Sequence, residues 1–168
     1  MWLSKYHEMS VGPLWVLRER SPDAALPATQ VCSHCAAPWL LSVPRQTDLL
    51  VVLPSGVSDQ AQLLLQNCLQ AAGWRDVAAL FSLHLPCANS AEAGLLALQN
   101  QLGTSPVATI VVFGADAAQR LDPTFVRGQI YSYQNARLIV THDPQQMLDT
   151  PALKAQVWSD LCLVLREA

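Results

Sequence analysis

The chain has 168 residues, of which 51% are hydrophobic and 14% charged, so it can bury a sizeable core. The net charge is −3 and the ten Lys and Arg residues form no cluster, which disfavours a nucleic-acid groove and favours protein partners. The first residues lack the apolar segment of a signal peptide and no apolar run could span a bilayer, so we expect a cytoplasmic protein with reduced cysteines.

Residues 1–47 are predicted to form an irregular arm that docks on a partner. Prolines recur along its second half and exclude a long helix: Pro22, Pro27, Pro38 and Pro44. Trp2, Trp15 and Trp39 would anchor this arm. Two interpretations remain open, because the indoles could cover a sheet edge or could belong to a docking peptide. Trp and Arg carry much of the binding energy in short interfaces.

Residues 48–168 alternate between buried-strand patterns and helical patterns. We expect strands at 48–53, 77–83, 109–113, 128–133 and 136–141. We expect helices at 61–72, 90–102, 115–121, 144–148 and 151–165. This alternation predicts one three-layer α/β/α domain with a mostly parallel central sheet.

Local signals mark the ends of several of these elements. Ser58 is a candidate N-cap and Gly73 a candidate C-cap of the first helix. Pro151 fits the first position of the last helix. The last two strands are expected to pair as a hairpin around Gln134 and Asn135.

Proline, glycine and polar residues follow three of the predicted strands, at the position where α/β proteins bind their ligands. These residues are Pro54, Ser55, Gly56, Gly114, His142 and Asp143. A phosphate cradle would need more glycines and a Lys. His142 and Asp143 could act as an acid–base pair, but adjacent side chains on an extended backbone point apart, and Asp143 could equally cap the helix that begins at Pro144.

The cysteines contain one paired motif. Cys32 and Cys35 form a CxxC, and Cys87 lies in a predicted loop. Because a structural metal site normally needs a second pair at a similar spacing, free loop thiols are favoured and we expect no cofactor. Metal binding by Cys32, Cys35 and Cys87 remains the alternative.

Residues 48–165 resemble the uracil-DNA glycosylase superfamily. The resemblance rests on DLLVVLPSG, VVFGADAAQRL, VRGQ, VTHDP and TPALKAQVWSDL. It implies that family's fold, with the strand-end residues as the remnant of its base pocket. The first catalytic motif reads Leu53-Pro54-Ser55-Gly56 without a water-activating residue, and the His-Pro-Ser motif reads His142-Asp143-Pro144. Cys32, Cys35 and Cys87 match three iron–sulfur ligands of the family, whereas residues 92–109 have no cysteine for the fourth.

The stretch EMSVGPLWVLRER resembles the docking peptide of the psi-subunit family of bacterial DNA polymerase III, which shares this fold without glycosylase activity. The matching positions are Val11, Leu14, Trp15, Leu17, Arg18 and Arg20. The resemblance implies a non-catalytic accessory subunit in DNA replication, whose arm docks on the clamp loader and whose domain holds the chi subunit. Contact with nucleic acid would then be indirect. The alternative is a divergent uracil-DNA glycosylase using His142.

Overall fold

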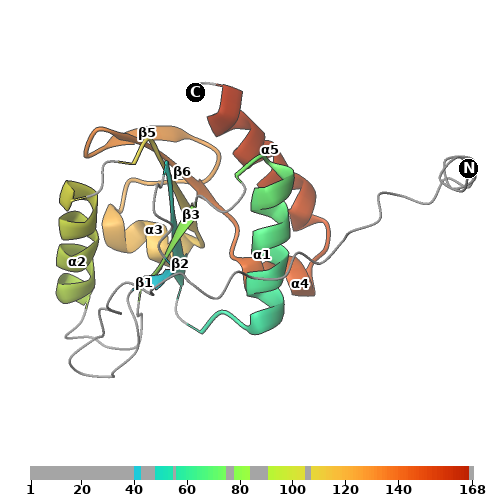
Figure 1. Cartoon of the computed structure of the whole chain (residues 1–168). Helices are drawn as coiled ribbons and strands as arrows, with labels where there is room; N and C mark the ends of the chain where they lie inside the picture. The colour runs from blue at the N-terminus through green and yellow to red at the C-terminus, as the bar shows by residue number, and fades with distance from the viewer. Residues whose placement is uncertain are drawn as a thin grey trace, which may run out of the picture.

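A mixed, mostly parallel sheet forms the centre of the molecule (Figure 1). The computed structural model describes residues 40–42, 48–54, 56–74, 78–83, 91–104 and 107–166. Within these residues, six strands lie in the order β1-β3-β2-β4-β6-β5. They are β1 (Leu40–Ser42), β2 (Leu49–Pro54), β3 (Ala78–Leu83), β4 (Thr109–Phe113), β5 (Ile130–Tyr133) and β6 (Ala136–Thr141).

The four inner strands are parallel, and the two outer strands are antiparallel to their neighbours. Every residue of β2 and β4 is buried. A parallel sheet that is covered on both faces selects such continuous apolar runs, which explains why the sequence reads LLVVLP and TIVVF at these strands. The predicted α/β class and mostly parallel sheet are therefore confirmed.

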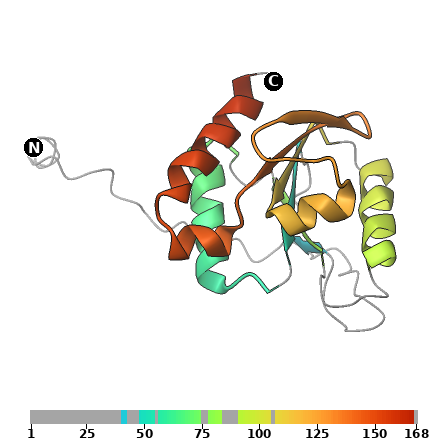
Figure 2. The same ribbon diagram turned by 180° about the vertical axis from the view of Figure 1, so that it is seen from behind.

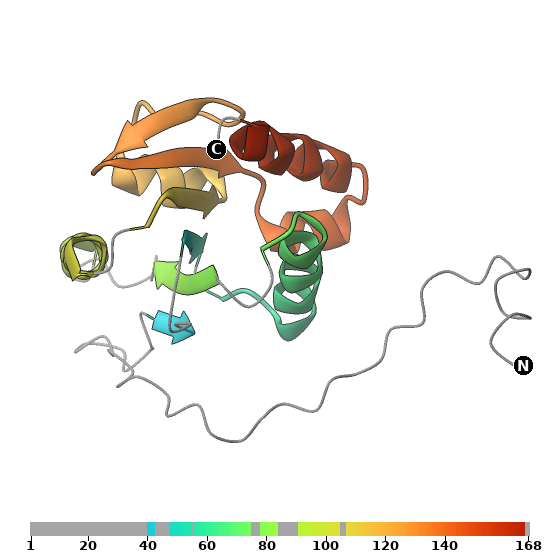
Figure 3. The ribbon, with the colours of Figure 1, turned by 45° about the horizontal axis from the view of Figure 1, so that its top comes forward.

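Helices cover both faces of the sheet (Figures 2 and 3). One face packs against α1 (Asp59–Ala71), α4 (Pro144–Asp149) and α5 (Leu153–Arg166). The other face packs against α2 (Ala91–Thr104) and α3 (Ala115–Leu121). Alternate residues of β2 serve the two cores, because Leu49, Val51 and Leu53 belong to the first, whereas Leu50 and Val52 belong to the second.

The caps predicted for α1 are confirmed. The Ser58 hydroxyl accepts a hydrogen bond from the Ala61 amide at 3.3 Å. At the other end, Gly73 has a φ of +98°, and the Trp74 amide donates to the Leu69 carbonyl at 2.9 Å while the Gly73 amide donates to Gln70 at 3.0 Å. This pair of bonds is a Schellman motif, which satisfies carbonyl groups that the helix leaves open.

The predicted β5–β6 hairpin is also confirmed. Gln134 and Asn135 have φ values of +46° and +69° and connect the two antiparallel strands. Positive φ at both central residues is typical of a type I′ turn, whose twist matches that of the strands.

Several elements differ from the sequence prediction. The strand expected at 128–133 begins at Ile130, and the helix expected at 61–72 begins at Asp59. The last helix begins at Leu153 and not at Pro151, because residues 150–152 form a turn in which the amides of Leu153 and Lys154 donate to the carbonyls three residues earlier. The strand β1 was not predicted, and it pairs with β3 at the edge of the sheet. No helix in the described part of the chain is long and apolar enough to cross a membrane.

Candidate functional site at the carboxyl ends of β2, β4 and β6

The ends of β2, β4 and β6 meet at one edge of the sheet because these strands are parallel neighbours. The Gly114 amide donates to the Thr141 carbonyl at 2.9 Å. Gly114 has a φ of +92°, and a Cβ on it would lie 3.8 Å from Pro54 Cγ and 3.7 Å from Asp143 Cβ. The structure thus brings together Pro54, Gly114 and Asp143, three of the residues that the sequence placed in one site.

Asp143 is engaged at the start of α4. Its Oδ1 accepts a hydrogen bond from the Gln145 amide at 2.7 Å, and Pro144 occupies the first turn. The Gln145 side chain accepts a 2.8 Å hydrogen bond from the Ser58 hydroxyl, which joins the start of α4 to the start of α1. Of the two sequence interpretations for Asp143, the structure realises the helix cap.

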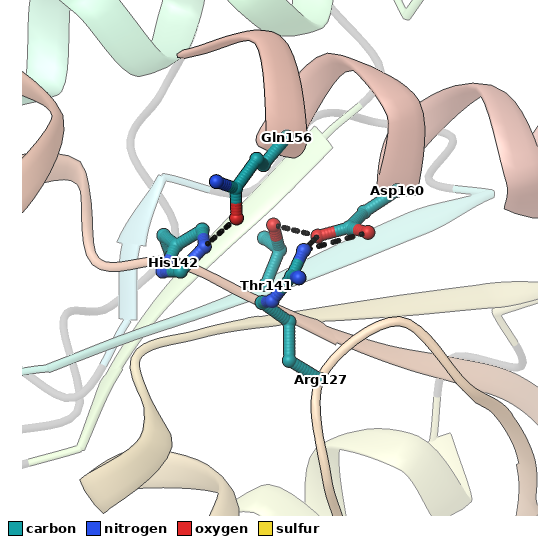
Figure 4. Close-up of polar contacts among 5 residues, drawn as sticks. All are labelled: Arg127, Thr141, His142, Gln156 and Asp160. Atoms are coloured by element: carbon teal, nitrogen blue, oxygen red, sulfur yellow. Dashed lines mark hydrogen bonds and ion pairs between the residues drawn. The ribbon is translucent and has the colours of Figure 1, made fainter. Parts of the chain in front are cut away.

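His142 is half-buried directly after β6. Its Nε2 lies 2.8 Å from Oε1 of Gln156, which comes from α5 (Figure 4). Because the amide oxygen accepts hydrogen bonds, Nε2 carries the proton in this contact. The imidazole is therefore oriented by the neutral amide of Gln156.

A third group of residues, which sequence reasoning missed, lies beside this histidine (Figure 4). Asp160 on α5 is only 5% exposed. Its Oδ2 accepts a hydrogen bond from the Thr141 hydroxyl at 2.7 Å, and Arg127 Nη1 contacts Oδ2 at 3.1 Å and Oδ1 at 3.3 Å. Asp160 thereby connects α5 to the end of β6 and to the segment before β5.

Gly128 brings its backbone close to this carboxylate. A Cβ on Gly128, whose φ is +75°, would lie 3.6 Å from Asp160 Oδ1, and the Gly128 amide donates to the Val140 carbonyl at 3.1 Å. A sequence signal for the contact existed, because Asp160 interrupts the apolar stripe of Val157, Leu161 and Val164 on α5. A charged residue in such a stripe indicates a buried partner.

Several predicted site residues lie outside the described residues. They are Ser55, the docking-peptide positions Val11, Leu14, Trp15, Leu17, Arg18 and Arg20, and the candidate ligands Cys32, Cys35 and Cys87. Gly56 is described, and it is exposed with a φ of +80°. The described residues contain no group of three or more His, Cys, Asp and Glu side chains that could hold a metal ion.

Two thiols are placed by the structure, Cys68 on α1 and Cys162 on α5, and both are free and half-buried. Burial raises the pKa of the Cys68 thiol, and the nearby Lys154 ammonium acts in the opposite direction. A raised pKa keeps a thiol protonated and unreactive at neutral pH, as expected of a thiol that contributes to packing.

The chain is an α/β protein. Polar contacts between its elements fix the edge of the sheet at which β2, β4 and β6 end. No known protein family matches the chain, and no curated protein matches it in sequence. Functional assignment therefore depends on the site residues and on the patterns in the sequence.

Proposed function

We propose that this chain is a non-catalytic, psi-like accessory subunit of the bacterial DNA polymerase III holoenzyme in DNA replication. In this proposal the domain has a uracil-DNA glycosylase-like fold that has lost its catalytic site. Its role is to connect the clamp loader with the chi subunit. The polymerase activity belongs to the holoenzyme, and the chain itself works by binding proteins in the cytoplasm.

The observation that carries the proposal is the use of Asp143. A water-activating site needs a carboxylate or amide that faces the bond to be broken. The carboxylate next to His142 instead accepts the Gln145 amide at the start of α4. The second nearby carboxylate, that of Asp160, is bound to Thr141 and Arg127. Asp143 and Asp160 therefore stabilise the fold, which supports loss of catalysis.

The docking role is assigned to the peptide ahead of the domain. Trp15 would supply the central buried group, because an indole combines a large apolar area with few rotatable bonds. Apolar neighbours and basic residues complete the peptide: Val11, Leu14, Leu17, Arg18 and Arg20. The basic residues would direct the peptide toward acidic groups on the clamp loader.

Replacing Trp15 tests the docking role. We expect Trp15→Ala to weaken binding to purified clamp-loader proteins by about 30-fold or more, since truncation of such an anchor typically costs about 2 kcal/mol. Surface plasmon resonance with the full chain measures this affinity. Leu63→Ala, which truncates an exposed leucine on α1 outside the arm, is the control and should bind like the wild type. Equal binding by the Trp15 variant would reject the docking role.

The alternative function is a divergent uracil-DNA glycosylase that uses His142. It is favoured by one observation, namely that the imidazole is half-buried at the carboxyl end of β6, where α/β proteins bind ligands. We expect no uracil release from a single-stranded oligonucleotide. Excision by the wild type that is lost in His142→Ala would establish the alternative, and visible absorbance from a cluster on Cys32, Cys35 and Cys87 would support it.

A further inference from the structure

Helix α5 has apolar residues on two faces. Leu153, Val157, Leu161 and Val164 pack against the sheet. A second set, which we call the outer α5 stripe, faces away from this core: Ala155, Trp158, Cys162 and Leu165. Trp158 is 44% exposed and Leu165 is 36% exposed. Large apolar groups that gather on one exposed helix face mark interaction surfaces more often than scattered ones do.

The spacing of the outer α5 stripe matches one kind of partner. Its members are separated by three, four and three residues, which is the pattern of a seam between two packed helices. From Ala155 to Leu165 the helix rises by about 15 Å, enough for roughly three turns of a partner helix. The stripe also contains a Trp, the residue type that most often dominates interface energies.

The charges beside the stripe decide which partner fits. Lys154 and Arg166 are exposed near its two ends, and neither forms an ion pair with another described residue. The acidic residue of α5, Asp160, is buried and bound to Arg127 and Thr141. The exposed surface of α5 is therefore basic at both ends.

This charge pattern argues against pairing with a second copy. A second copy of α5 would bring no exposed carboxylate to either cation, because Asp160, the acid of this helix, is buried. Opposite charges that face each other across an interface favour association and select the partner. A helix with an apolar seam and acidic flanking residues supplies those charges.

We propose that the outer α5 stripe docks an amphipathic helix of a partner protein whose seam is flanked by acidic residues. Trp158 and Leu165 supply the apolar contact, and Lys154 and Arg166 select the charge of the partner. The inference deepens the adaptor role by naming a second docking surface, and it rests on that role only in requiring that the chain binds proteins. Binding through Trp15 is a separate measurement.

Two synthetic peptides test the proposal. Both form an amphipathic helix with a leucine seam of the same spacing, and they differ in carrying glutamates or lysines beside it. Fluorescence anisotropy with the full chain should show that the acidic peptide binds about tenfold or more tightly than the basic one. Trp158→Ala should weaken that binding about tenfold or more. Leu63→Ala, which truncates an exposed leucine on α1, is the matched control and should bind like the wild type.

Charge reversal keeps the test decisive if the Trp158 variant fails to fold. The double variant Lys154→Glu/Arg166→Glu changes two exposed side chains and should bind the basic peptide in preference to the acidic one. Equal binding of both peptides, or of neither, overturns the proposal. So does a wild-type dimer in sedimentation that dissociates on Trp158→Ala, because the occupant would then be a second copy. Clamp-loader binding that persists in the Trp158 variant shows that the arm and the stripe act separately.

Discussion

At the level of single residues, Asp160 connects more of the structure than any sequence motif suggested. Its carboxylate is contacted from β6 by Thr141 and from the segment before β5 by Arg127. The Arg127 side chain is 42% exposed, so solvent screens this ion pair and its own contribution is small. The buried hydrogen bond from Thr141 is the more important contact, because its donor and acceptor are both shielded from water.

We expect Asp160→Ala to lower the free energy of unfolding by about 2–3 kcal/mol, since it leaves a buried hydroxyl without an acceptor and removes packed atoms. Thr141→Val should cost about 1 kcal/mol, and the double variant should cost less than the sum because the two groups share one bond. Urea denaturation measures these values. Asp149→Ala, at an exposed acid on α4, is the control and should change stability by less than about 0.5 kcal/mol. A similarly small effect at Asp160 would contradict the structural role given to it here.

Asp122, after α3, provides a pH-dependent contact. Its Oδ1 accepts hydrogen bonds from the Thr124 hydroxyl at 2.7 Å and the Thr124 amide at 2.8 Å, and these bonds lower the pKa of the carboxyl below its ordinary value of 3.8. A carboxyl whose pKa is lower in the folded state stabilises the fold above the ordinary pKa. That stabilisation is lost as the pH falls through the folded-state pKa.

Thr124→Val should raise the pKa of Asp122 toward 3.8 without reaching it, because the amide donor remains while the hydroxyl is removed. An NMR titration of the side-chain carboxyl carbon measures this change. Thr150→Val alters an exposed threonine elsewhere and should leave the titration as in the wild type. An unchanged pKa in the Thr124 variant would show that the hydroxyl does not contribute.

At the level of secondary-structure elements, the sequence predicted best those elements with strong local signals. The bounds of β4, α3 and β6 agree with the prediction. Gly114 separates β4 from α3, the Gln134-Asn135 turn precedes β6, and the Asp143 cap follows β6. By contrast, β1 has three residues, and its pairing with β3 joins segments far apart in the sequence. Local patterns do not contain that information.

The same distinction applies to the candidate site. Its strand-end residues could be placed together from the sequence, because parallel neighbouring strands end at one edge of a sheet. The contacts of Gln156 with His142 and of Asp160 with Thr141 could not, because they depend on how α5 lies across β6. The order of strands in the sheet, which sets these neighbours, is a property of the whole fold.

The Schellman motif at the end of α1 gives a prediction with a built-in control. Gly73→Ala should lower the free energy of unfolding by about 1 kcal/mol, because its φ of +98° is unfavourable for a residue with a Cβ even though nothing lies within 4 Å. Gly103→Ala in α2 also meets nothing within 4 Å, but its φ is not in that region, so stability should stay equal or rise by up to about 1 kcal/mol. Thermal or urea unfolding compares the two. Equal effects of both changes would mean that the backbone angle of Gly73 is not limiting.

At the level of the whole molecule, the folded unit begins before residue 48, because it includes β1. The strand covers the outer edge of β3, and an uncovered strand edge tends to pair with other chains. We therefore place the beginning of the sheet within the segment that the sequence assigned to the arm.

Two truncated chains test this placement. A chain of residues 48–168, which lacks β1, should be less stable by about 1 kcal/mol or more and should self-associate in size-exclusion chromatography with light scattering. A chain of residues 36–168 retains β1 and is the control, which should remain monomeric. If both fragments behave alike, β1 does not protect the sheet.

The position of α5 in the chain also bears on how the protein folds. Val157, Leu161 and Val164 complete the core on one face of β4 and β6, and the carboxylate of Asp160 meets Thr141 only when this helix is in place. The part of the sheet that α5 covers therefore stays exposed until residues 153–166 have been synthesised and have packed. A folding intermediate that lacks this helix exposes apolar strand residues such as Val111 and Ile139, which makes it prone to aggregate.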